Sequence, residues 1–325
     1  MTIKTVTAKL VMPVMIGGAN ARECDDPPTL RPPAVRGMLR FWTRSLGGDH
    51  PNSLESRLWG STDTGQGISV LSSISLPSPE QRKLFPSKPA DRQASTLMCH
   101  PDGKQLTIGF RIPEESLVEP LQAVVWTWLH LGAIGRRSRR GYGSLHWCST
   151  RNPDDLFKGS GFEEFDEQKH LANCSALREY LKTGFKGMNK KVVDGLHPPD
   201  MTRARQCSSW FRFSTLDQVF VGGMKTEQLT NRRFGLEDLI HGKDWQARAV
   251  KAAERNQMGG HGQERLASPM MWRLFRTQTG SYIPVMTWSP REKIVALPGD
   301  SEMYMYLHDD LGFDKSLAGT TGLGV

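Results

Sequence analysis

Residues 117–148 read LVEPLQAVVWTWLHLGAIGRRSRRGYGSLHWC, and the predicted architecture depends mainly on this segment. Its first part, Leu117–Ile134, is apolar on every side at helical spacing, which predicts a buried helix. A loop rich in glycine and arginine follows, and Ser144–Cys148 has the pattern of a short strand. We therefore expect a helix that packs on a sheet, followed by the strand that closes that sheet.

The segments upstream complete a β-α-β-β-α-β order. Alternation over residues 3–16 predicts a strand. The segment LRPPAVRGMLRFWTRSLGG, residues 30–48, predicts a helix that begins at the proline pair and stops at the glycine pair. The remaining predicted elements are a short helix Ser53–Leu58 and the strands Ile68–Leu76 and Leu106–Ile112. This order is typical of a ferredoxin-like domain, which we place at residues 1–150.

Residues 151–325 predict a second unit with similar ingredients. A short helix is expected at Ala176–Thr183, a strand in residues 209–222, an amphipathic helix at Leu236–Glu254 and a hairpin in residues 270–288. We interpret this half as a second ferredoxin-like domain with a helical insertion. The predicted fold class is thus α+β, with tandem ferredoxin-like domains.

Composition favours a cytoplasmic protein with a polyanionic partner. The chain has 325 residues, and its formal net charge is 42 − 34 = +8. The apolar run over residues 121–134 is too short to span a bilayer, and the N-terminus lacks the pattern of a signal peptide. No CxxC motif occurs among the five cysteines, so we expect reduced thiols and no metal or other cofactor. These cysteines are Cys24, Cys99, Cys148, Cys174 and Cys207.

Two arginine clusters carry a charge of +8 between them, equal to the whole formal excess. The first lies on the 30–48 helix and just before it, and comprises Arg31, Arg36, Arg40 and Arg44. The last three are four residues apart, so they share one helix face. This face could bind phosphate, or it could be a solvated face or one whose arginines pair with acids from elsewhere in the chain.

The second cluster is the glycine-rich loop at residues 135–143. It comprises Gly135, Arg136, Arg137, Arg139, Arg140, Gly141, Tyr142 and Gly143. Glycines let a backbone approach a phosphate closely, and arginine forks match phosphate oxygens. We expect Tyr142 to be able to stack on a base, and the two clusters to face one groove. The alternative is a basic loop that only keeps the protein soluble.

Three segments resemble the RAMP superfamily of type III CRISPR effectors. RPPAVRGMLRFWTRSLGG and IGRRSRRGYGSL resemble the helix and the glycine-rich loop of the family that forms the first subunit of type III-B (Cmr) complexes. RLASPMMWRLFR, residues 265–276, resembles a later segment of the same family. Thr43 stands where that family often has a second tryptophan. The neighbouring Trp42 lies on the apolar stripe of the helix, so core packing is its expected role.

The resemblance implies tandem ferredoxin-like domains and a non-catalytic, RNA-binding subunit near the 3′ end of the crRNA. Its partners would be crRNA, target RNA and neighbouring RAMP subunits. The arginines and glycines of both clusters would be the RNA-binding residues.

Two enzymatic alternatives and one binding alternative stay open. Asp25 and Asp26 lie between the first strand and helix, where they could hold a metal ion for RNA cleavage, although Asp-Asp-Pro-Pro is also ordinary turn chemistry. A crRNA-processing ribonuclease would need a histidine beside its RNA site, and the histidines are scattered; His130 lies on the buried helix and is expected to be a core residue. Docking of other subunits is compatible with RNA binding.

Overall fold

The computed structural model describes sixteen stretches of the chain. They are residues 1–16, 29–47, 54–62, 65–71, 74–75, 78, 80–83, 96–99, 103–136, 138–139, 141–148, 152–162, 164–193, 216, 218–223 and 270–288. The predicted helix Leu236–Glu254 lies outside these residues, as does most of the strand expected in residues 209–222.

The first half of the chain has the predicted β-α-β-β-α-β order. Its main elements are β1 (Thr2–Leu10), α1 (Pro32–Gly47), β5 (Ser69–Leu71), β9 (Gln105–Ile112), α3 (Val118–Leu131) and β10 (Leu145–Cys148). The four strands form an antiparallel sheet in the order β10-β1-β9-β5. Thus β9 lies between β1 and β5, the two strands that α1 connects.

This unit also contains several short helices and strands. They are β2 (Thr29–Leu30), α2 (Leu54–Trp59), β3 (Gly60–Ser61), β4 (Gly65–Gln66), β6 (Ile74–Ser75), β7 (Glu80–Lys83), β8 (Thr96–Cys99) and the 3-10 turn η1 (Glu115–Leu117). The first strand is shorter than the predicted 3–16, because the regular ladder ends at Leu10; Val14 and Met15 make only bridge contacts beyond Pro13.

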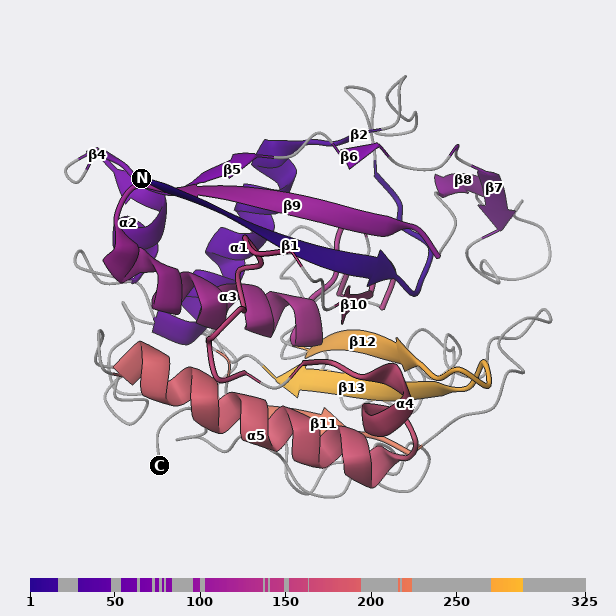
Figure 1. The fold of residues 1–325 in the computed structure, drawn as a ribbon. Helices are drawn as coiled ribbons and strands as arrows, with labels where there is room; N and C mark the ends of the chain where they lie inside the picture. The colour runs from indigo at the N-terminus through magenta and orange to yellow at the C-terminus, as the bar shows by residue number, and fades with distance from the viewer. Residues whose placement is uncertain are drawn as a thin grey trace, which may run out of the picture.

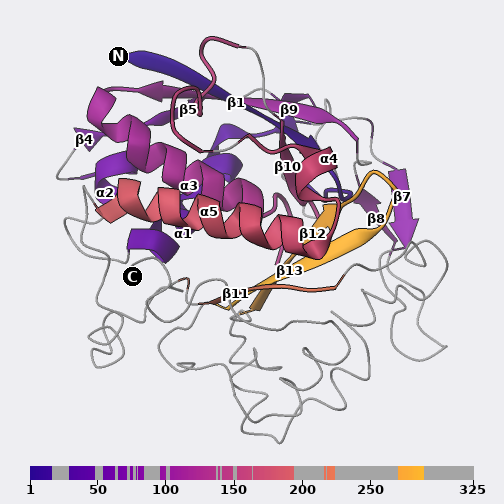
Figure 2. The same cartoon turned by 60° about the horizontal axis from the view of Figure 1, so that its bottom comes forward.

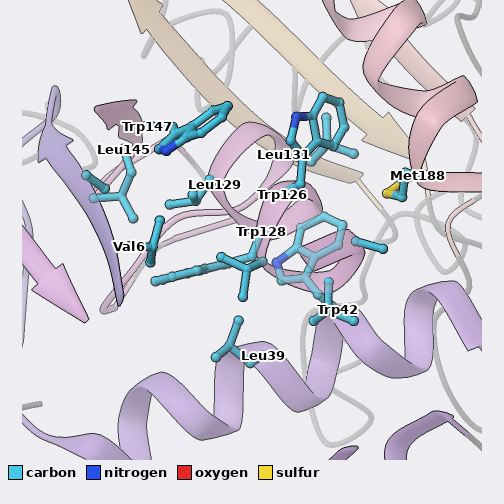
Figure 3. Packing of buried hydrophobic residues seen from close by; sticks show 14 of the residues in the cluster. Val6, Leu39, Trp42, Trp126, Trp128, Leu129, Leu131, Leu145, Trp147 and Met188 are labelled. Atoms are coloured by element: carbon cyan, nitrogen blue, oxygen red, sulfur yellow. The ribbon is translucent and has the colours of Figure 1, made fainter. Parts of the chain in front are cut away.

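Helices α1 and α3 lie side by side on one face of the four-stranded sheet (Figure 1). The core around α3 is aromatic: Trp42 of α1 and Trp126 and Trp128 of α3 are all buried, together with Val6 of β1 and Trp147 of β10 (Figure 3). The helix α3 is buried at nearly every position, as its uniform apolarity predicted. The core role expected for Trp42 and His130 is confirmed.

The second half adds two layers to the same core. The helices α4 (Glu167–His170) and α5 (Cys174–Val193) follow β10, and α5 packs lengthwise along α3 (Figure 2). A three-stranded sheet has the order β11-β13-β12, from β11 (Gln218–Val221), β12 (Met270–Arg276) and β13 (Tyr282–Trp288). The predicted hairpin is confirmed, with Gly280 at φ 84° in its turn.

The predicted end of the helix at Thr183 is wrong, since α5 continues for ten more residues through Gly184 and Gly187. Both glycines pack against aromatic side chains: Gly184 against Trp126 and Gly187 against Phe162. Within the described residues, no helix is long and apolar enough to cross a bilayer.

Candidate nucleic-acid interface

The helix α1 has three distinct sides. Val35, Leu39, Trp42 and Leu46 form its buried stripe. At about 100° per residue, Arg36, Arg40 and Arg44 fall on one flank of this stripe, and Met38 and Phe41 fall on the other. Gly37 lies between the two flanks and is exposed, and Ala34 is exposed on the Met38–Phe41 flank. We call this exposed side the α1 crest.

The arginine flank of α1 faces α2. Arg40 Nε donates to Glu55 Oε1 at 2.5 Å, and Arg44 Nη1 donates to the same oxygen at 3.0 Å. Arg36 Nη2 donates to the carbonyl oxygen of Trp59 at 2.5 Å. Pairing with an acid from elsewhere, which the sequence left open, is therefore found for Arg40 and Arg44. Arg31 and Arg36 remain exposed to solvent.

The glycines of the loop are required by the fold. A Cβ on Gly135, at φ 80°, would lie 2.5 Å from the Met15 carbonyl oxygen, and one on Gly143, at φ 69°, would meet the Ile134 carbonyl. The backbone N–H of Arg136 donates to Met15, and that of Gly143 donates to Pro13. These N–H groups face protein acceptors, so they do not serve a phosphate as we had expected.

Tyr142 requires a correction. Its side chain is only 4% exposed, so the ring lies in the interior and cannot stack on a base in this conformation. Gly141 is also buried, against Leu274 of β12. Arg136 is exposed and Arg139 is half-buried, whereas Arg137 and Arg140 lie outside the described residues.

The loop contacts α1 on the flank opposite the arginines. The Arg139 guanidinium lies 5.4 Å from the ring centre of Phe41, in cation–π geometry. Beside it is a small pocket of about 100 Å³ that α1, the end of α3, the loop and Met271 line together. Among the described residues, Arg36, Arg40 and Arg44 thus lie on one side of the α1 crest and Arg139 on the other, and these four do not face one groove.

The loop and β10 also hold the second sheet. Alternate residues of β12 donate backbone N–H groups across its free edge: Trp272 to the Arg139 carbonyl at 2.9 Å, Leu274 to Ser144 Oγ at 3.2 Å and Arg276 to His146 Nε2 at 3.3 Å. Since the Arg276 N–H needs an acceptor, Nε2 carries no proton, and Nδ1–H is left to donate to Glu167 Oε1 at 3.3 Å. We call this row the β12 seam.

Buried titratable groups gather behind the seam. Burial is the main cause that lowers the pKa of His146 to about 4, although its hydrogen bond to Glu167 works in the opposite direction. Burial and then the charge of Arg273 hold the pKa of His130 well below its usual value. His130 is a satisfied core residue, bonded to the Trp126 carbonyl and to Tyr180. Arg273 is itself buried over Phe275, and burial lowers its pKa.

Other candidate chemistry is sparse in the described part of the chain. A hollow of about 620 Å³ beside residues 152–164 carries Lys158, Asp155 and Glu164, so its net charge does not favour an anion. No group of three or more metal-ligating side chains occurs among the described residues. Asp25 and Asp26 lie outside them.

Sequence reasoning missed Glu55 and the β12 seam. Glu55 is the one acid of the short helix LESRLW, which follows a helix that has three arginines and no acid of its own, so this pattern could have indicated it. The seam joins residues about 130 positions apart through backbone N–H donors. Nearly every residue type has such a donor, so the sequence does not reveal these bonds.

Comparison with known proteins finds similarity to one superfamily over the first half of the chain. Residues 7–146 match the family model of the RAMP superfamily. The chain is 25% identical over 162 residues to the CRISPR system Cmr subunit Cmr1-1 of Pyrococcus furiosus; the match covers 44% of this chain and 48% of that protein, about half the length of each.

Two solved structures share the fold. The crystal structure of apo Cmr1 from Pyrococcus furiosus has a TM-score of 0.62 at 17% identity, over 98% of this chain and 100% of the other. A chain from a cryo-EM structure of the type III-B Cmr-beta complex, bound to cognate target RNA and AMPPnP with ssDNA present, has a TM-score of 0.54 at 9% identity, over 90% and 96%. The predicted resemblance to the RAMP superfamily and to the first Cmr subunit is confirmed.

Proposed function

We propose, from the RAMP-superfamily match of residues 7–146, that this chain is a non-catalytic RNA-binding subunit of a type III-B CRISPR effector complex. It would act in the cytoplasm, beside other RAMP subunits, on the backbone of crRNA and target RNA near the crRNA 3′ end. Sequence would be read by pairing between guide and target, and this subunit would hold phosphates.

The observation that carries the proposal is the exposed α1 crest with arginines on both sides. On the arginine flank Arg36 is exposed and the Arg40 side chain is 42% exposed, and on the other flank half-buried Arg139 lies over Phe41. Arg31 and Arg136 are also exposed. Guanidinium groups spread over two flanks of a helix suit a flexible polyanion that crosses the helix, because each phosphate can meet a fork. Phe41, half-buried beneath Arg139, adds an aromatic surface within the same region.

The domain organisation belongs to the same proposal. We propose a ferredoxin-like RAMP domain at residues 1–150 and a second ferredoxin-like domain with a helical insertion at residues 151–325. The sheet order β11-β13-β12 is consistent with the core of such a domain. The β12 seam would then fix the second domain against the glycine-rich loop of the first.

The test is binding of fluorescently labelled single-stranded RNA to the full chain over a salt series. Arg36→Ala and Arg136→Ala should each weaken binding for every RNA sequence. Each should also flatten the logarithmic salt dependence by about 0.7 for one lost phosphate contact. Lys182→Ala removes an equal charge from the exposed side of α5 and is the matched control, which should bind like the wild type.

The same samples on a denaturing gel test the enzymatic alternative. Intact RNA with and without Mg²⁺ is the expected result. RNA that is cut only with Mg²⁺ and spared by Asp26→Asn would replace the proposal by a metal-dependent ribonuclease. Wild-type binding by both arginine variants would refute a phosphate role for the crest.

A further inference from the structure

The short helix α2 is fixed tightly on the arginine flank of α1. Trp59 Nε1 donates to Thr43 Oγ1 at 2.8 Å, and both side chains are fully buried. Arg36 bonds to the carbonyl of the same tryptophan. These contacts hold the α2 backbone in register with α1, so the position of Glu55 in the first turn of α2 is determined by the core.

Glu55 places one carboxylate oxygen between two guanidinium groups. The residue is 7% exposed, and a carboxylate so buried requires charged or hydrogen-bonding partners. Its Oε1 accepts from Arg40 Nε and from Arg44 Nη1. The charge of this trio is therefore +1, and the arginines four residues apart do not simply repel one another.

The bond to Arg40 leaves the end of that side chain available. A guanidinium is planar and has five N–H donors in fixed directions, so fixing Nε fixes the other four. Within the described part of the chain, Arg40 bonds to Glu55 through Nε. Its terminal nitrogens form the fork that binds two oxygens of a phosphate at once.

We propose that Glu55 is a positioning residue for RNA: it orients the Arg40 guanidinium so that its terminal fork meets a backbone phosphate. This inference rests on the proposed RNA-binding function. The inference predicts that removing the negative charge of Glu55, beside the phosphate site, weakens the binding of a polyanion. Simple electrostatics requires the opposite, that loss of Glu55 tightens RNA binding at every salt concentration.

The experiment compares three substitutions of Glu55 in the full chain, with labelled single-stranded RNA. Glu55→Gln keeps an acceptor oxygen and should bind within about twofold of the wild type, or more tightly. Glu55→Ala and Glu55→Met remove the acceptor and should weaken binding by about five- to tenfold, the loss expected for about one ordinary hydrogen bond at a partly exposed site. Both should also flatten the salt dependence by about 0.7. Glu179→Ala removes an exposed acid of α5 and controls for net charge.

A double-mutant cycle separates positioning from a general structural effect. In an Arg40→Ala background, Glu55→Met should cause no further loss, because the group that it orients is absent. The thermal midpoint of each variant is measured first. Methionine keeps the length and buried volume of the side chain, so it carries the test if the alanine variant does not fold.

The outcomes separate this inference from the proposed function. If Arg40→Ala weakens binding while Glu55→Met binds as tightly as the wild type or more tightly, the positioning role is wrong and the RNA site stands. If Arg36→Ala, Arg40→Ala and Arg136→Ala all bind like the wild type, the RNA site itself is wrong. An equal loss from Glu55→Met with and without Arg40 would also overturn the positioning role.

Discussion

Replacing Gly184 of α5 should destabilise the protein, because α5 contacts Trp126 of α3 at this residue. An alanine Cβ at this position would lie 2.5 Å from Cη2 of Trp126 and closer still to Cζ2. Optimal carbon contacts are about 3.5–4.0 Å, so the overlap is at least about 1 Å. Trp126 cannot move away alone: it is fully buried, its ring is stacked 4.3 Å from that of His130, and Phe162 and Phe185 contact it on other sides.

The expected cost follows from two opposing contributions. Overpacking of a rigid core costs about 1–3 kcal/mol, and the overlap here places Gly184→Ala at the upper end. Alanine returns about 0.8–1 kcal/mol of helix propensity. We expect a net loss of about 2 kcal/mol in the free energy of unfolding, measured by urea or guanidinium denaturation followed by tryptophan fluorescence.

Gly37→Ala is the matched control. Gly37 also lies inside a helix, but its Cβ would meet no atom within 4 Å, so this variant should gain up to about 1 kcal/mol from propensity alone. The difference between the two variants, about 3 kcal/mol, isolates the contact with Trp126. A Gly184→Ala protein as stable as Gly37→Ala would refute the packing of α5 on α3 described above.

Two further predictions concern the β12 seam. Ser144→Ala removes a buried hydroxyl that donates to the Gly141 carbonyl at 2.7 Å and accepts from Leu274 N–H, so it should lower the free energy of unfolding by about 1–3 kcal/mol, whereas the exposed Ser116→Ala should change it little. Acid should destabilise the same seam, because the pKa of His146 is about 4 in the folded protein and near 6.5 in the unfolded chain. The contribution of neutral His146 to the free energy of unfolding is complete above pH 6.5 and falls as the pH is lowered. Near pH 4 the free energy of unfolding should be about 3 kcal/mol smaller. A His146→Gln protein that loses stability over this pH window as steeply as the wild type would contradict this assignment.

The elements in the first half of the fold could be predicted from the sequence, because the residues that begin, end and bury each element lie within or next to it. Proline at the start and glycine at the end delimit α1, and a run without a formal charge that has apolar residues on every side, residues 121–131, predicts α3 and its burial. The end of α5 was missed for a physical reason. Glycine usually ends or weakens a helix, but Gly184 is kept inside one because a tryptophan 58 positions earlier occupies the space of its side chain.

The candidate site divides in the same way. Arginine spacing correctly indicated one face of α1, but the counter-charge came from another helix, and only tertiary structure brings Glu55 to Arg40 and Arg44. The loop glycines were predicted to admit a phosphate. They instead admit neighbouring backbone at Gly135 and Gly143, where any Cβ would collide with a carbonyl group. A pattern of glycine and arginine therefore indicates that another group packs closely against the loop backbone, but it does not indicate whether that group is a phosphate or another part of the protein.

Net charge and available charge are consequently different quantities for this protein. The two clusters sum to +8 in sequence, but Glu55 reduces the first from +4 to +3, and Arg44, with a side chain 23% exposed, is held against it. Apart from Arg44, the exposed or half-buried members among the described residues are Arg31, Arg36, Arg40, Arg136 and Arg139. Five phosphate contacts correspond to a salt slope of about 3.5 in magnitude on single strands. Arg137 and Arg140 could raise it to about 5. A steeper slope would require that Arg44 leaves Glu55, or that cations outside both clusters also bind RNA. The salt dependence of the wild type therefore measures how many of the basic side chains contact RNA phosphates.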